Sequence, residues 1–146
     1  MALKDDPRRL SHAGYPFALV VPTRFGDVDL HRHLNNVAVQ RLFEEGRVRF
    51  HRHLRQTHPA IGWPHFLVAH QATDFLSEGQ YPDDVDVRLG VGAIGSSSHR
   101  LALGLFQNGR AFALADTVMV HRAAEGPGSA PLPQALRSAL QEYALD

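Results

Sequence analysis

After the longest apolar stripe of this sequence, the hydrophobic period changes from that of a helix to that of a strand, and this change limits the folds that the chain can adopt. Between Asn36 and Leu54, apolar side chains recur at the spacing of one helix stripe. The stripe consists of Val39, Leu42, Phe43, Phe50 and Leu54. From Phe66 onward, apolar residues alternate with polar residues or glycine, which is the period of a half-buried strand. We therefore predict an α+β domain in which an antiparallel sheet is wrapped around one long helix.

Turn and breaker residues set the boundaries of the other predicted elements. A first strand is predicted from Phe17 to Arg24, because the turn residues 26–29 follow it. Alternation is clearest in three later segments, which are residues 85–93, 101–105 and 112–120. The dipeptide Asn108-Gly109 between the last two is a strong hairpin signal. A linker rich in glycine and proline precedes a short predicted helix over residues 134–143. The predicted order is one strand, one long helix and four antiparallel strands.

Length and charge narrow the class of protein. The chain has 146 residues, which is the length of one domain. Residues 1–14 are polar, so we predict a flexible N-terminal arm before a single domain over residues 15–146. Fifteen basic residues balance fifteen acidic ones, which argues against nucleic acid as a partner. Since the sequence shows no apolar signal region and no membrane span, we expect a soluble, cytoplasmic protein without a membrane partner.

Composition also excludes several kinds of chemistry. The sequence has no cysteine, which excludes disulfides, thiolate metal sites and cysteine nucleophiles. Lys4 is the one lysine, so lysine-based Schiff-base chemistry is not expected in the domain. Two His-x-His pairs occur, at 31/33 and 51/53, but helical residues two apart point to nearly opposite faces. We therefore expect neither a functional metal nor a cofactor.

The last turns of the long predicted helix carry a series of arginines. They are Arg47, Arg49, Arg52 and Arg55. We expect them on a solvated face, where they complement the negative end of the helix dipole; the alternative is that they bind the phosphates of a nucleotide or of nucleic acid. Glu44 and Glu45 are expected to form ion pairs with neighbouring arginines; the alternative is that one of them faces a functional site. Gly46 is expected to pack closely against the sheet.

An acidic pair, Asp27 and Asp29, precedes the N-terminus of the long helix. The first N–H groups of a helix lack intrahelical acceptors and carry partial positive charge, so they can stabilise an oxyanion. A carboxylate from the preceding turn can attack the same carbonyl or deprotonate a water aimed at it. This arrangement is typical of acyl transfer. The alternative for either acid is a structural role in a turn or a helix cap.

Residues 23–47, TRFGDVDLHRHLNNVAVQRLFEEGR, resemble the signature of hotdog-fold acyl-CoA thioesterases, the 4-hydroxybenzoyl-CoA thioesterase group. That signature runs arginine–aromatic–x–Asp–x–Asp, then Gly-His-Val-Asn-Asn, then a helix ending in aromatic–Glu–Glu–Ala–Arg. The resemblance covers about residues 17–140 and implies hydrolysis of an acyl thioester to carboxylate and free CoA thiol. It also implies a homodimer or tetramer with the acyl tunnel at the interface.

The resemblance also implies roles for individual residues. Asp29 corresponds to the catalytic carboxylate of the family, which acts as nucleophile or as general base. The backbone N–H of Asn36 corresponds to the group that holds the thioester oxygen, with Asn35 beside it. His33 matches the motif histidine that shapes the mouth of the pocket.

Three further positions are candidates for substrate binding. Arg32 occupies the glycine position of the motif, so its side chain is expected either to narrow the approach to the carbonyl or to contact substrate. Ser97 lies in a glycine–serine bend that the family often has between strands, and Arg100 follows it. Both are candidates for binding CoA. Its phosphates are expected at Arg100, with Arg88 and His99 as the alternatives near the same bend.

Two other functions fit the same fold. One is a hotdog hydratase or dehydratase that acts on acyl thioesters. The other is a non-catalytic acyl-CoA-binding domain. Two departures from the motif would permit it, Arg32 in place of glycine and Val39 where the family commonly has an aromatic residue. A thioesterase requires the Asp29 carboxylate to reach the helix start at Asn36, whereas a binding domain does not.

Overall fold

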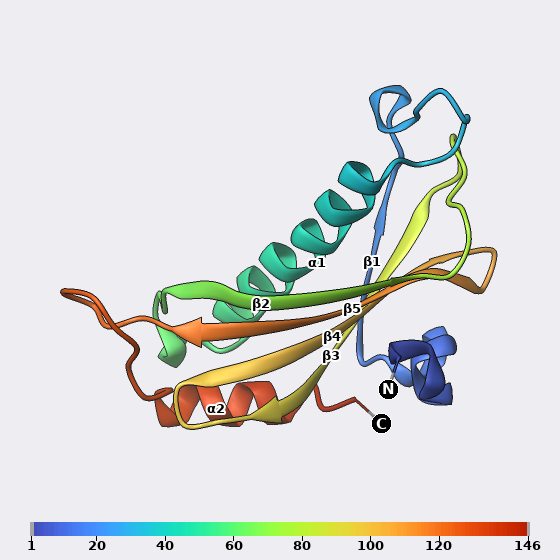
Figure 1. Ribbon diagram of the computed structural model, residues 1–146. Coiled ribbons are helices and arrows are strands. Elements are labelled where there is room, and N and C mark those ends of the chain that lie inside the picture. Colours follow the sequence, from blue (N-terminus) through green and yellow to red (C-terminus); the bar gives the residue numbers. More distant parts are fainter. Residues whose placement is uncertain (1, 146) are drawn as a thin grey trace.

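The computed structural model describes residues 2–145 and contains five β-strands and two α-helices (Figure 1). They are β1 (Phe17–Val21), α1 (Asn36–Thr57), β2 (Phe66–Phe75), β3 (Val85–Ile94), β4 (Ser98–Gln107), β5 (Arg110–His121) and α2 (Gln134–Gln141). Neighbouring strands are antiparallel and follow the order β1-β3-β4-β5-β2 across the sheet. The predicted order of elements is confirmed, although α1 ends at Thr57 rather than Leu54 and β1 ends at Val21 rather than Arg24.

Helix α1 lies across one face of the sheet and buries the apolar stripe that the sequence predicts (Figure 1). The fully buried members of the stripe are Leu42, Phe43, Phe50 and Leu54. A Cβ atom at Gly46 would lie 2.8 Å from Val87 Cγ1 and 3.3 Å from Leu103 Cδ2. The helix therefore approaches the sheet as closely at Gly46 as the sequence predicted. Neither α-helix within residues 2–145 combines the length and the apolar character needed to cross a bilayer.

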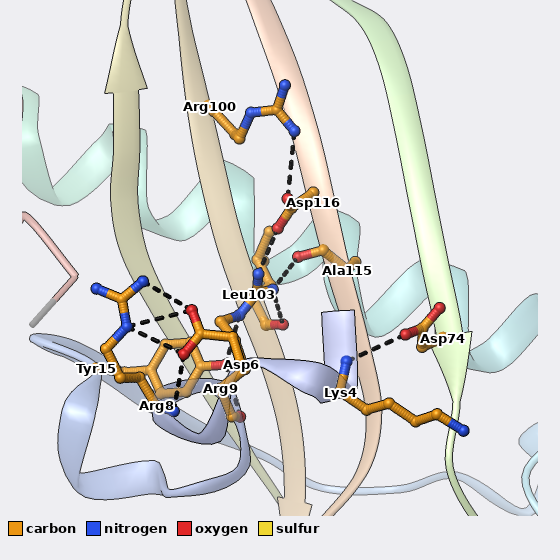
Figure 2. Close-up of polar contacts among 10 residues, drawn as sticks. All are labelled: Lys4, Asp6, Arg8, Arg9, Tyr15, Asp74, Arg100, Leu103, Ala115 and Asp116. Atoms are coloured by element: carbon orange, nitrogen blue, oxygen red, sulfur yellow. Dashed lines mark hydrogen bonds and ion pairs between the residues drawn. The ribbon is translucent and has the colours of Figure 1, made fainter. Parts of the chain in front are cut away.

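Residues 2–14 lie against the sheet as three short 3₁₀ turns (Figure 2). The buried guanidinium of Arg9 donates to the Asp116 carboxylate at 2.6 Å and to the carbonyl oxygen of Ala115 at 2.8 Å. It also donates to the carbonyl oxygen of Leu103 at 3.3 Å. A buried guanidinium requires such acceptors. These contacts join Arg9 to the sheet, within the segment of residues 1–14 for which the polar composition predicts a flexible arm.

Two loops meet at one end of the sheet, one before α1 and one after β2 (Figure 1). The backbone N–H of Leu34 donates to the carbonyl oxygen of Gly79 at 2.9 Å. A Cβ atom at Gly79 would lie 2.7 Å from Leu34 Cδ1 and 2.8 Å from Phe112 Cε2. Glycine is therefore needed here for the two loops to approach each other. This contact places the residues that follow β2 beside the start of α1.

Candidate active site

Asp27 is a buried structural residue that joins the loop to helix α1. Its carboxylate accepts the backbone N–H of Arg24 at 2.9 Å and the guanidinium of Arg41 at 2.7 Å. Burial acts to raise the pKa of Asp27, but these hydrogen bonds and the two arginine charges outweigh burial and lower it. The carbonyl oxygen of Asp27 also accepts the backbone N–H of Asn35 at 2.9 Å. Asp27 thus has the turn role that the sequence favours for it.

Asp29 lies in the following turn, and its side chain is exposed. Its Oδ1 accepts the backbone N–H of His31 at 2.8 Å, and its carbonyl oxygen accepts the N–H of Arg32 at 3.0 Å. Within residues 2–145, no donor lies within hydrogen-bond distance of Asp29 Oδ2. One carboxylate oxygen therefore builds the turn, and the other is available to a substrate.

The first turn of α1 presents two free backbone donors. Asn35 is the N-cap of the helix, because its side-chain oxygen accepts the N–H of Ala38 at 2.8 Å. Asn36 is the first helical residue. No protein acceptor in the described part of the chain pairs with the N–H of Asn36 or of Val37. These groups lie at the positive end of the helix dipole.

A pocket of about 210 Å³ joins the Asp29 turn to the start of the helix. It is lined by Asp29, His31, His33, Leu34, Asn36, Val39, Phe75, Ser77, Glu78 and Gly79. The structure thus brings Asp29, His33 and Asn36 together. The residues contributed by the loop after β2 were missed in the sequence, because that loop has no periodic pattern and only Gly79 marks a close approach.

His33 is held by two residues of the loop after β2. Its Nε2 lies 2.8 Å from Glu78 Oε2, and its Nδ1 lies 3.2 Å from the Gln80 amide nitrogen. Since an amide nitrogen only donates, Nδ1 is the acceptor and Nε2 carries the proton that Glu78 accepts. Both ring nitrogens are therefore occupied, and in this arrangement His33 forms a wall of the pocket.

Asp29 also lines a second pocket, of about 400 Å³. The remaining lining residues are Phe25, Val28, Arg32 and Tyr81. The rings of Phe25 and Tyr81 meet edge to face, with centroids 6.0 Å apart. This second pocket is mainly apolar, and Arg32 contributes a positive charge to it.

Ser97 and Arg100 lie far from Asp29 within the chain. They lie where β4 begins, whereas the Asp29 pocket includes Phe75, which pairs with the opposite end of β5. The β5 partners of Ser98 and Phe75 are seven residues apart, which corresponds to roughly 23 Å along the strand. Arg100 lies 3.3 Å from the Asp116 carboxylate (Figure 2). The structure therefore does not bring these two candidates to the site.

The arginines of α1 differ from the expected solvated series. Arg49 pairs with Glu45 at 2.9 Å, as expected of neighbours one helix turn apart. Arg47 is instead buried, and it donates to Gln71 Oε1 on β2 at 3.0 Å. The expectation of a solvated Arg47 is therefore wrong, because α1 turns this position toward β2.

A buried histidine pair was also missed in the sequence. Nε2 of His51 on α1 lies 3.1 Å from Nε2 of His99 on β4, and the His51 ring stacks on Phe66. Burial lowers the pKa of His51 to about 3 and the pKa of His99 to about 4. Both rings are therefore neutral near pH 7. No group of three or more histidine or acidic side chains within residues 2–145 is arranged to hold a metal ion.

Comparison with known proteins gives a family. Residues 23–140 match the model of the thioesterase-like superfamily. A thioesterase from Thermus thermophilus, solved with coenzyme A and zinc, is 30% identical, with 88% of this chain and 94% of that chain covered and a TM-score of 0.74. A predicted thioesterase from Bacillus stearothermophilus is 27% identical, with coverage of 88% and 96% and a TM-score of 0.77.

A protein of Pseudomonas aeruginosa strain PAO1 shares the fold, at 24% identity, coverage of 93% and 96%, and a TM-score of 0.80. No curated protein matches the sequence significantly. The family match confirms the hotdog fold and the thioesterase resemblance that the Asp-x-Asp segment predicts. The chain belongs to the thioesterase-like superfamily and is an enzyme of the thioester hydrolase class.

Proposed function

We propose that this protein hydrolyses an acyl-CoA thioester to a carboxylate and free CoA thiol, with Asp29 as the catalytic carboxylate. One observation carries the proposal. Asp29, with its free Oδ2, and Asn36, with its free backbone N–H, line the same pocket. An acyl-CoA-binding domain has no need of this arrangement. CoA as the thiol carrier is supported by the Thermus thermophilus relative, whose structure contains coenzyme A.

The thioester carbonyl oxygen accepts hydrogen bonds from the N–H groups of Asn36 and Val37. Donors aimed at a developing oxyanion are a large source of rate acceleration, since loss of one typically costs about 10²- to 10³-fold. Asp29 then acts in one of two ways. As a nucleophile it attacks the carbonyl carbon and expels the thiolate, and water hydrolyses the resulting anhydride. As a general base it takes a proton from the water that attacks the carbonyl directly. Both routes consume one water and give carboxylate and thiol.

A homodimer formed through β2 is part of the proposal. β2 is an edge strand that pairs only with β5 in the described chain, and it leaves apolar side chains exposed. Those side chains are Leu67, Val68 and Phe75. An exposed apolar edge is typical of a strand that pairs with a second copy. Phe75 also lines the Asp29 pocket, so such a dimer would place the pocket at the interface. Light scattering of the purified protein should give twice the monomer mass.

Thiol release from a panel of short, long and aromatic acyl-CoAs tests the activity. The protein contains no cysteine, so it contributes no thiol background to the assay. We expect turnover of at least one panel member, together with binding of its CoA thioester. Binding of acyl-CoA without turnover of any member would instead support the binding-domain alternative.

A single turnover in ¹⁸O-labelled water shows whether water attacks the carboxyl carbon of Asp29, a step that only the nucleophilic route contains. If it does, the first product carries no label and the label enters Asp29. If Asp29 is the general base, or if water attacks the acyl carbon of the anhydride, the first product carries the label and Asp29 does not. Mass spectrometry of the product and of the peptide that contains Asp29 reads both outcomes.

A further inference from the structure

Arg32 adopts a backbone conformation that its residue type disfavours. Its φ is 64°, in the left-handed region, where a side chain with a Cβ atom costs free energy. Within residues 2–145 the one other non-glycine residue with positive φ is Asn108, and asparagine tolerates this region. The motif that this segment resembles has glycine at the position of Arg32. The chain therefore retains an arginine at a position where glycine would fit the turn without strain.

The charge of Arg32 is not used in the fold. Arg24 and Arg41, the other arginines near this turn, both pair with Asp27. In the described chain, no carboxylate lies within ion-pair distance of Arg32. Arg32 instead lines the pocket of about 400 Å³ that Asp29 also lines. Its charge is thus free beside the residue that we place at the reacting carbonyl.

The walls of this pocket suit an organic group that carries a charge. Phe25, Val28 and Tyr81 supply apolar and aromatic surface, and Arg32 supplies a planar guanidinium. A guanidinium binds a carboxylate through two parallel hydrogen bonds. A mainly apolar pocket with one cation in its lining favours ligands that combine a hydrocarbon part with an anionic group.

We propose that Arg32 binds an anionic group on the acyl part of the substrate, so that the enzyme prefers acyl thioesters that carry a carboxylate. The inference rests on the proposed thioesterase function. The phosphates of CoA are the other source of negative charge, but the long pantetheine arm separates them from the thioester. The Arg32 backbone N–H lies 3.0 Å from the Asp29 carbonyl oxygen. Arg32 is thus a direct neighbour of Asp29 and lines the same pocket, whereas the phosphates lie at the far end of the pantetheine arm, which favours the acyl carboxylate.

Matched thioester pairs test the proposal. Succinyl-, glutaryl- and adipoyl-CoA each have a neutral counterpart, namely butyryl-, valeryl- and hexanoyl-CoA. The same acyl groups on pantetheine remove the CoA phosphates. Wild type is compared with Arg32→Gly and Arg32→Lys. In Arg32→Gly we expect kcat/KM for the best carboxylate substrate to fall about tenfold or more, mainly through KM, as expected for loss of a charge-assisted hydrogen bond. The neutral counterpart should change less than twofold, and Arg32→Lys should retain part of the preference.

The results that overturn the proposal are distinct. An equal loss on charged and neutral acyl groups would assign Arg32 to the turn, and a loss seen with CoA but not with pantetheine would assign it to the phosphates. The unfolding midpoint of Arg32→Gly should not fall, because glycine relieves the strained φ; a lower midpoint would indicate a structural role. If wild type hydrolyses no thioester, the proposed function fails, and calorimetric binding of adipoyl-CoA and hexanoyl-CoA still measures the discrimination by Arg32. No difference between those two ligands would overturn this inference as well.

Discussion

Acid is expected to destabilise this protein through the buried pair of His51 and His99. Burial lowers the pKa of His51 to about 3 and of His99 to about 4, whereas both titrate near 6.5 in the unfolded chain. As the pH falls below 6.5, the unfolded chain binds protons that the folded chain does not bind. The stability that depends on neutral rings is thus fully present above pH 6.5 and is lost as the pH falls toward 4.

The expected loss is large compared with the stability of a small domain. A histidine that is protonated only in the unfolded chain costs about 1.4 kcal/mol per pH unit. For the two rings together, the loss at pH 4.5 relative to pH 7 is about 5 kcal/mol, against a usual stability of about 5–15 kcal/mol. The lowered pKa of Asp27 changes the free energy of unfolding mainly at pH values below this range, because an unfolded aspartate titrates near 3.8.

Urea unfolding at several pH values between 7 and 4.5, followed by circular dichroism, measures this effect. A single substitution would leave the Nε2 atom of the remaining ring without its hydrogen-bond partner. The double variant His51→Leu/His99→Leu avoids this because it removes both rings together. We expect the slope of stability against pH to flatten by about two protons relative to wild type. The control His65→Gln changes an exposed histidine and should keep the wild-type slope. An unchanged slope in the double variant would refute the assignment to this pair.

Two further substitutions test how the site is built. Asn35→Ala removes the cap oxygen that accepts the Ala38 N–H. The free energy of unfolding should therefore fall by about 1 kcal/mol, and kcat should fall with it. Unchanged values of both would show that the cap does not hold the helix start. Gly79→Ala places a Cβ atom against Leu34 and Phe112, which should cost about 1–3 kcal/mol in urea unfolding. Gly26→Ala is its control, since a Cβ atom at Gly26 meets nothing within 4 Å, and equal effects would contradict the packing account.

The order of elements could be predicted because each element follows one hydrophobic period. The apolar stripe of α1 and the alternation at the start of β3 both face the core, so burial there repeats the pattern in the sequence. In β4 the residues 101–106 are all buried, so that strand is covered on both faces rather than on the one face that alternation predicts. The Asn108-Gly109 hairpin was equally readable, and both residues have positive φ as that dipeptide favours. Glu45 and Arg49 pair because their spacing alone brings them together.

Features that depend on tertiary contacts could not be predicted. Nothing near Arg9 in the sequence indicates that Asp116 and two strand carbonyls, more than ninety residues away, accept its hydrogen bonds. Arg47 lies on the side of α1 that faces β2, and its guanidinium donates a hydrogen bond to Gln71 on that strand. This contact could not be predicted, because it depends on where β2 packs. His51 and His99 are likewise joined by the packing of α1 on β4.

The candidate site was readable where its parts are close in sequence. Asp29 and Asn36 are seven residues apart, and one turn and one helix start bring both to the same pocket. Glu78 reaches this pocket from a distant loop, so no local pattern announces it. Ser97 was assigned to the site from the family resemblance and Arg100 from the affinity of arginine for phosphate, and the sheet separates both from the site within the chain.

Thiol release by Asp29→Asn tests the central claim most directly. The asparagine side chain keeps the size of aspartate and one oxygen that can accept the His31 N–H, so the turn should be preserved. With the best acyl-CoA of the panel, we expect kcat to fall about 10²-fold or more while acyl-CoA binding is retained. Asp84→Asn, at an exposed acid before β3, is the matched control and should keep full activity. An Asp29→Asn enzyme with kcat within tenfold of wild type would contradict the role of Asp29.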